Sequence, residues 1–111
     1  MKIKYLHFRH TQPDTIQDGK YKVGEVMPTG GMCVAYQLDD KYQVLGFAIS
    51  RCHKHDNYVK QQGRVKATGR LASENYFVQV ALPEQEFIVK MDNLWQQTKN
   101  EWFADKKTPA F

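Results

Sequence analysis

One short run of residues combines types that can bind a metal or act as a nucleophile, namely Cys52-His53-Lys54-His55-Asp56. Structural zinc needs ligands that converge tetrahedrally, and these commonly come from two separated pairs. A second pair is missing here, so His7 and His10 could complete a site only if the first strand passed beside Cys52. We therefore expect a strand-to-helix connection with polar side chains in solvent, and neither a metal nor a cofactor.

Other catalytic arrangements are also missing from the sequence. Acid-base and nucleophilic catalysis need a positioned base and a group that stabilises developing charge. There is no nucleophile elbow and no pair of carboxylates in an apolar setting; Gly30-Gly31 is too short for a phosphate loop, and Asp39-Asp40 fits a turn. We expect a protein that is not an enzyme, and the alternative is a small enzyme with a site near Cys52 and His53.

The positive charge of the chain is concentrated in one stretch. The whole chain of 111 residues carries a net charge of +4. Residues 51–70 contain six basic residues against Asp56 alone, a local net charge of +5, whereas the rest of the chain has 10 basic and 11 acidic residues. Such asymmetry is typical of an interaction surface.

The basic stretch is predicted to form a helix over residues 56–72. Asp56 or Asn57 can accept hydrogen bonds from its first turn. Tyr58, Val65 and Ala72 fall on one apolar face, Lys60 and Arg64 lie along one edge of that face, and Lys66 and Arg70 lie along the other. Gly63 and Gly69 each weaken such a helix by about 1 kcal/mol, a cost that is tolerated where a backbone must approach the sheet or a partner closely.

These two basic edges suggest a binding surface. Like charges four residues apart on a helix repel one another, which a purely structural helix would avoid. Phosphates of nucleic acid, or an acidic protein surface, would relieve that repulsion. Arg64 and Arg70 are the expected anchors, because a guanidinium binds phosphate or carboxylate bidentately. The expected supporting charges are Lys60, Lys66, Lys54 and Arg51. The alternative is a solvated helix face.

The run Cys52-x3-Asp56-x-Tyr58-x4-Gly63-Arg64-x2-Ala67-x-Gly69-Arg70-Leu71 resembles a segment of many small, mostly uncharacterised proteins of phages and prophages. In that segment a cysteine, an aspartate and an aromatic residue precede two Gly-Arg pairs. The match covers residues 52–71, and Tyr58 stands where phenylalanine is usual.

Small phage proteins of this type are often accessory factors that bind host machinery, including inhibitors of host defence nucleoproteins such as CRISPR effectors. The resemblance implies a mobile-element context and not an activity. Together with the basic helix, it leads us to expect a non-enzymatic accessory protein that binds nucleic acid or a host nucleoprotein in the host cytoplasm. The alternative is a protein-only inhibitor, an adaptor or a homodimer, in which Gly63, Ala67 and Gly69 of the same helix allow close packing.

The remaining chain supplies strands and one long helix. Alternating apolar residues predict strands over residues 2–8, 32–39, 42–50 and 75–82, with a small hairpin around Asp18-Gly19. From Pro83, an apolar stripe predicts a helix of about 20 residues. The stripe comprises Phe87, Ile88, Met91, Leu94, Trp95 and Trp102. The alternative is a strand over residues 87–91 and a shorter helix from Asp92.

The composition fits one domain over residues 1–111. The hydrophobic fraction of 41% and the aromatic fraction of 13% can supply one core. The order of elements predicts an α+β fold, a small antiparallel sheet of three to five strands with two helices on one face. Without a bilayer-length apolar run, a leader or a disulfide framework, we expect a cytoplasmic protein.

Overall fold

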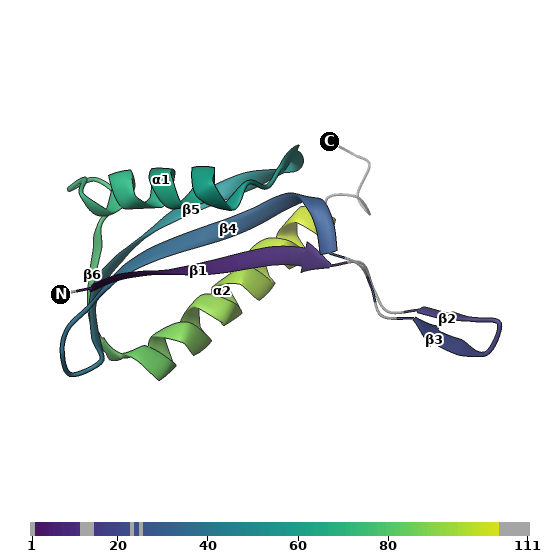
Figure 1. Cartoon of the computed structure of the whole chain (residues 1–111), viewed down its shortest axis with the longest axis horizontal. Helices are drawn as coiled ribbons and strands as arrows, with labels where there is room; N and C mark the ends of the chain where they lie inside the picture. The colour runs from purple at the N-terminus through teal and green to yellow at the C-terminus, as the bar shows by residue number, and fades with distance from the viewer. Residues whose placement is uncertain (1, 12–14, 23, 25, 105–111) are drawn as a thin grey trace.

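The computed structural model describes residues 2–11, 15–22, 24 and 26–104 (Figure 1). Four antiparallel strands form the main sheet in the order β1-β4-β5-β6. Their bounds are β1 Lys2–Thr11, β4 Val26–Leu38, β5 Gln43–Asn57 and β6 Val78–Pro83. The helices are α1 Lys60–Leu71 and α2 Glu84–Ala104. The expected α+β class with an antiparallel sheet is confirmed.

The two helices cover opposite faces of the sheet, so their expected placement on one face is wrong (Figure 1). Strand β4 explains the difference, because residues 30–36 are buried on both sides. Its large side chains Met32, Val34 and Tyr36 pack with α2, and its small side chains Cys33 and Ala35 pack with α1. A central strand that is apolar on both faces needs a cover on each.

Helix α1 begins at residue 60, four residues later than expected, and neither Asp56 nor Asn57 caps it. Its N-cap residue is Val59, which makes no side-chain capping bond. The preceding residues instead extend β5 to Asn57 through a bulge: Cys52 lies opposite Gly31, and Asn57 lies opposite Thr29. Pairing with β4 therefore keeps residues 53–57 in the strand.

The buried face of α1 is also different from the expected one. Ala67 and Leu71 are buried, whereas Val65 is 67% exposed and Ala72 is exposed. Gly63 faces the sheet so closely that a Cβ there would lie 3.1 Å from Cys33 Cβ. Residues 63, 67 and 71 therefore form the stripe of α1 that contacts the sheet. The helix packs close to β4 and β5 because the side chains beneath it are small.

Helix α2 is the long helix that the apolar stripe predicts, and the alternative strand over residues 87–91 is wrong. Phe87, Met91 and Trp95 are buried against the sheet, while Ile88 and Leu94 are half-buried. The side chain of Trp102 lies outside the described part of the structure. The first residue of the helix, Glu84, accepts hydrogen bonds from Tyr36 Oη at 2.8 Å and from Lys4 Nζ at 2.9 Å.

Both expected turns are present. Asp18 and Gly19 have positive φ values of 52° and 75° between β2 Thr15–Gln17 and β3 Lys20–Lys22, as a tight two-residue hairpin requires. This hairpin projects beyond the end of the main sheet (Figure 1). In the β4–β5 turn, Asp39 Oδ1 accepts hydrogen bonds from the backbone N–H groups of Lys41 and Gln43 at 2.8 and 2.9 Å.

None of the described helices is long and apolar enough to cross a membrane.

Candidate binding surface on the α1 face

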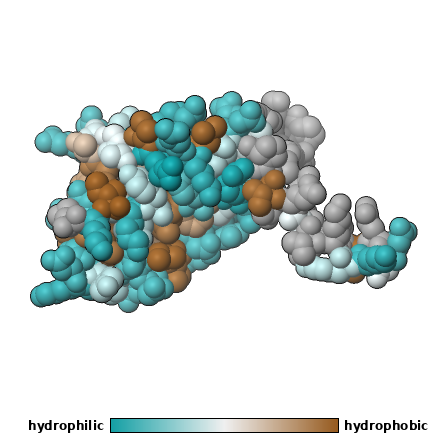
Figure 2. Space-filling view, viewed as in Figure 1, coloured by the Kyte–Doolittle hydropathy of each residue, from teal (hydrophilic) through white to brown (hydrophobic). Residues whose placement is uncertain are grey.

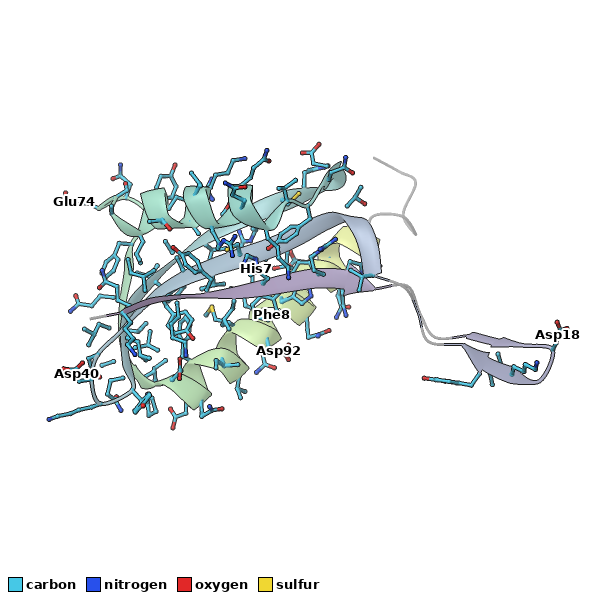
Figure 3. All side chains as sticks on the ribbon, in the orientation of Figure 1. His7, Phe8, Asp18, Asp40, Glu74 and Asp92 are labelled. Atoms are coloured by element: carbon cyan, nitrogen blue, oxygen red, sulfur yellow. The ribbon has the colours of Figure 1, made fainter. Side chains whose placement is uncertain are left out.

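Because the helices lie on opposite faces of the sheet, the charges of the two helices are divided between those faces. Helix α1 carries four basic residues and no acidic one. Helix α2 carries Glu84, Glu86, Asp92 and Glu101 against Lys90 and Lys99. Figure 3 places the labelled Asp92 on the side away from α1. Of the two helices, α1 is therefore positive and α2 carries a net negative charge.

The basic side chains of α1 lie on the two flanks of its buried stripe. We call Lys60 and Arg64 the β1-side row, because both act electrostatically on His7 of β1. We call Lys66 and Arg70 the β5-side row, because Lys66 lines a pocket with β5 and Arg70 bonds to β5. The pairing into two rows is the one predicted from helical spacing.

The outward surface of α1 between the two rows is uncharged. Gln61, Gln62, Val65 and Gly69 are all exposed there. In Figure 2 the surface on this side is mostly hydrophilic, with separate apolar residues rather than one apolar patch. A polyanion that contacts both rows would therefore cross a neutral helix surface, where no carboxylate of α1 repels it.

The six expected binding residues fall into three groups. Lys60, Arg64, Lys66 and Arg51 are exposed, as a binding role requires. Arg70 is half-buried: its Nη1 donates to the carbonyl oxygen of Ile49 at 2.8 Å, and its Cζ lies 5.2 Å from the ring centroid of Tyr76. The side chain of Lys54 lies outside the described part of the structure. Arg70 therefore has a structural role that its spacing did not indicate.

A polar cluster lies beside the β1-side row. His7 Nδ1 and Tyr58 Oη are 2.6 Å apart, and Tyr58 Oη donates to the carbonyl oxygen of Met32 at 3.3 Å. Both bonds form together when His7 Nδ1 carries the proton and donates to Tyr58. The guanidinium of Arg9 lies 4.7 Å from the centroid of the Tyr58 ring. In Figure 3, His7 and Phe8 leave β1 on opposite sides, and His7 points toward α1.

The surroundings of His7, Tyr58 and the neighbouring Cys33 favour the neutral form of each side chain. Burial and the positive charges of Lys60, Arg64 and Arg9 lower the pKa of His7. Burial raises the pKa of Tyr58 above its ordinary value and raises that of the Cys33 thiol to about 11. An activated nucleophile would need the opposite shift. After burial, the positive charges of the β1-side row are the next largest cause of the lowered pKa of His7. The contact between His7 and Tyr58 was not predicted, because the two residues are 51 positions apart in the sequence.

The run around Cys52 is built into the β5 bulge. Cys52 is half-buried, and its Sγ lies 3.3 Å from the carbonyl oxygen of Asp56 and 3.4 Å from that of Asn57. His53 is exposed, and the side chain of His55 lies outside the described residues. Among the residues that the structure describes, no group of three or more metal-ligating side chains comes together.

The two helix glycines have different surroundings. Gly63 faces Cys33, so it lets α1 pack closely on the sheet of the same chain and is not available for packing against a partner protein. Gly69 is exposed, and a Cβ at this position would have no neighbour within 4 Å. Of the residues expected to pack closely against a partner, only Gly69 is open to one, because Ala67 is buried as well.

The chain matches no family model, no curated protein and no solved structure. The resemblance of residues 52–71 to phage and prophage segments therefore stays a prediction. The geometry itself offers a positive helix, two basic rows and a neutral helix surface between them.

Proposed function

We propose that this protein is a non-enzymatic nucleic-acid-binding protein whose α1 face holds the phosphate backbone. The observation that carries the proposal is the placement of two basic rows on one face, opposite the acidic helix α2. Lys60 and Arg70 lie ten residues apart, which is about 15 Å along the axis of a helix. At about 3.4 Å per phosphate along one strand, this length matches four or five phosphates of a duplex.

Lysine and arginine on such a surface bind phosphates mainly by displacing condensed counterions, so affinity depends steeply on salt. Arg64 supplies a planar guanidinium that can bind one phosphate bidentately, and Lys60 and Lys66 supply point charges. Arg51 adds a further exposed cation beside the β5-side row. Arg70 contributes its charge from a fixed position, because it is bonded to Ile49.

The first test is the salt dependence of binding to mixed-sequence DNA and RNA, single- and double-stranded. The parent protein should bind at low salt, and log affinity should fall linearly with log salt. The variant Lys60→Gln/Lys66→Gln should bind more weakly and lower the slope by about two on duplex DNA. The matched control Lys41→Gln/Lys90→Gln removes two exposed lysines outside α1 and should change neither quantity much.

If the parent protein binds no nucleic acid at low salt, the proposal is wrong. It is also wrong if the control variant loses as much affinity as the α1 variant, because the binding would then follow net charge rather than the α1 face.

A more specific version of the proposal is that the nucleic acid belongs to a host defence nucleoprotein, such as a CRISPR effector, and that the protein is a phage-type accessory factor. The resemblance of residues 52–71 supports this version. Pull-down from a host lysate should then recover a complex that nuclease treatment weakens.

A second candidate is a protein-only inhibitor or adaptor, and the neutral outward surface of α1 favours it. Val65 is 67% exposed and Gly69 leaves its backbone open. A partner captured equally well after nuclease treatment would indicate this function. A symmetric dimer through α1 is disfavoured, because two-fold symmetry places the same patch of both copies in contact and would bring the basic rows together.

A further inference from the structure

A second surface feature lies at the edge of the sheet, next to the β5-side row. Strand β6 pairs with β5 only between Gln43 and Phe47, so the later part of β5 has no β6 neighbour. A groove of about 420 Å³ opens there. Its lining contains two arginines and no acidic residue: Phe47, Ile49, Arg51, Arg70, Asn75, Tyr76 and Val78.

The walls of this groove combine flat apolar groups with fixed positive charge. Tyr76 is 56% exposed and Val78 is 47% exposed, while Phe47 and Ile49 are half-buried. Phe47 lies directly opposite Val78 in the register of the two strands. Side chains of such a pair stand on the same face of a sheet. Here it is the face covered by α2, because Phe47 packs against the ring of Phe87. The groove therefore lies at the open edge of the sheet, where Arg70 reaches from α1 to the Ile49 carbonyl oxygen.

Arg70 fixes the position of the Tyr76 ring at the side of the groove. Its guanidinium is fixed by the 2.8 Å hydrogen bond to the Ile49 carbonyl oxygen and lies over the ring of Tyr76. The backbone of the same turn is held by bonds from the N–H groups of Tyr76 and Phe77 to the carbonyl oxygen of Ser73, at 3.2 and 3.0 Å. The ring of Tyr76 is therefore already positioned in the absence of a ligand.

We propose that this groove binds one unstacked base of a single-stranded nucleic acid, with Tyr76 as the stacking surface. A base has a flat π-face that stacks on aromatic side chains, and basic side chains near it hold the backbone. Arg51 is placed to contact the adjoining phosphate, because it lines both this groove and the pocket beside Lys66. The inference rests on the proposed function and names its substrate class.

Single strands fit this groove better than the two obvious alternatives. Bases of a duplex are paired and stacked, so they cannot enter without the cost of unstacking. The carboxylates of an acidic peptide would need paired N–H groups of the arginine guanidinium groups, but one terminal nitrogen of Arg70 already donates to the carbonyl oxygen of Ile49. The stacking surface of Tyr76 would also remain unused by a carboxylate.

The test compares single-stranded and duplex DNA of the same length and composition. Tyr76→Ala should lower affinity for the single strand by about 5- to 140-fold, the usual effect of losing one base stack. Its affinity for the duplex and the salt slope should stay as in the parent. Tyr76→Phe should bind like the parent, because it keeps the ring. Tyr42→Ala, which removes an exposed tyrosine at the β4–β5 turn, is the matched control.

A fluorescent base analogue in the strand supplies an independent measurement, since stacking on Tyr76 should quench it in the parent and in Tyr76→Phe but not in Tyr76→Ala. The inference is overturned if Tyr76→Ala binds single strands like the parent, or if it loses duplex and single-strand affinity equally. Tyr76-dependent competition by poly-glutamate would overturn it by assigning the groove to acidic protein. A parent that binds no nucleic acid overturns the proposed function as well, so the two failures are distinguishable.

Discussion

Arg70 on α1 and Ile49 on β5 are joined by a 2.8 Å hydrogen bond that ties the helix to an edge of the sheet not covered by β6. Arg70→Ala removes that bond and the guanidinium that covers Tyr76. We expect a loss of about 1.5 to 3 kcal/mol in the free energy of unfolding, as for a lost hydrogen bond to a charged group. Arg64→Ala should stay within about 0.5 kcal/mol, because its side chain is exposed. Urea unfolding of both variants checks this, and equal losses would contradict it.

The two glycines of α1 should respond oppositely to alanine. Gly69→Ala should raise the free energy of unfolding by about 0.5 to 1 kcal/mol, because a Cβ there meets nothing and alanine favours the helix. Gly63→Ala should gain nothing or lose stability, because its Cβ would lie 3.1 Å from Cys33 Cβ in the central strand. Thermal unfolding of both variants separates them. A larger gain for Gly63→Ala would mean that α1 does not lie this close to β4.

The face covered by α2 should contain the residues most sensitive to truncation. Phe87 is fully buried and lies between the rings of Tyr36 and Phe47, with centroid separations of 4.9 and 5.2 Å. Phe87→Ala should cost about 3 to 5 kcal/mol. Leu94→Ala should cost less, because Leu94 is half-buried, and the exposed Val89→Ala is the control. Denaturant unfolding should rank the three in this order, and a loss below half a kcal/mol at Phe87 would place α2 away from the sheet.

Stability should fall as the pH is lowered through about 6.5 because of His7. Burial and the charges of Lys60, Arg64 and Arg9 lower its pKa in the folded protein below the ordinary value of 6.5. The unfolded chain therefore binds a proton at a pH where the folded protein does not, and that difference favours unfolding as pH falls toward the folded pKa. His7→Gln should show a shallower decline in melting temperature over the same range. Parallel curves for parent and variant would show that His7 does not contribute.

The same histidine should report phosphate binding at the β1-side row. A phosphate that neutralises Lys60 and Arg64 removes part of the repulsion that disfavours the charged imidazole. We expect the pKa of His7, followed by NMR titration, to rise when nucleic acid is added. Lys60→Gln/Arg64→Gln should raise it without nucleic acid and remove the further response. An unchanged titration at saturating nucleic acid would place the ligand away from this row.

Local periodicity was sufficient to predict the elements that depend on nearby residues. The tight hairpin at Asp18-Gly19 and the long helix α2 are present as predicted, and so is the pairing of β4 with β5. The start of α1 was wrong because the β5 bulge is fixed by pairing with β4, which is distant in the sequence. The predicted buried face of α1 was wrong because Gly63 and Ala67 are small and contribute little to an apolar sequence pattern. In the structure these two residues lie on the side of α1 that contacts the sheet.

The candidate site was predictable only in part for the same reason. Helical spacing alone placed Lys60, Arg64 and Lys66 in two rows along α1. It could not show that Arg70 bonds to Ile49, or that Tyr58 meets His7, because those contacts join elements through the fold. The strand predicted over residues 75–82 includes Tyr76, whereas the structure places this residue in the turn before β6.

The opposite placement of the two helices separates their charges, with the positive helix α1 on one face of the sheet and the net negative helix α2 on the other. In the field of a polyanion such a molecule turns its positive helix forward before any contact forms, which raises the fraction of productive encounters. The division of charge thus acts first on the association rate. Moving the same net charge evenly over the surface would leave the long-range attraction but remove the steering of orientation.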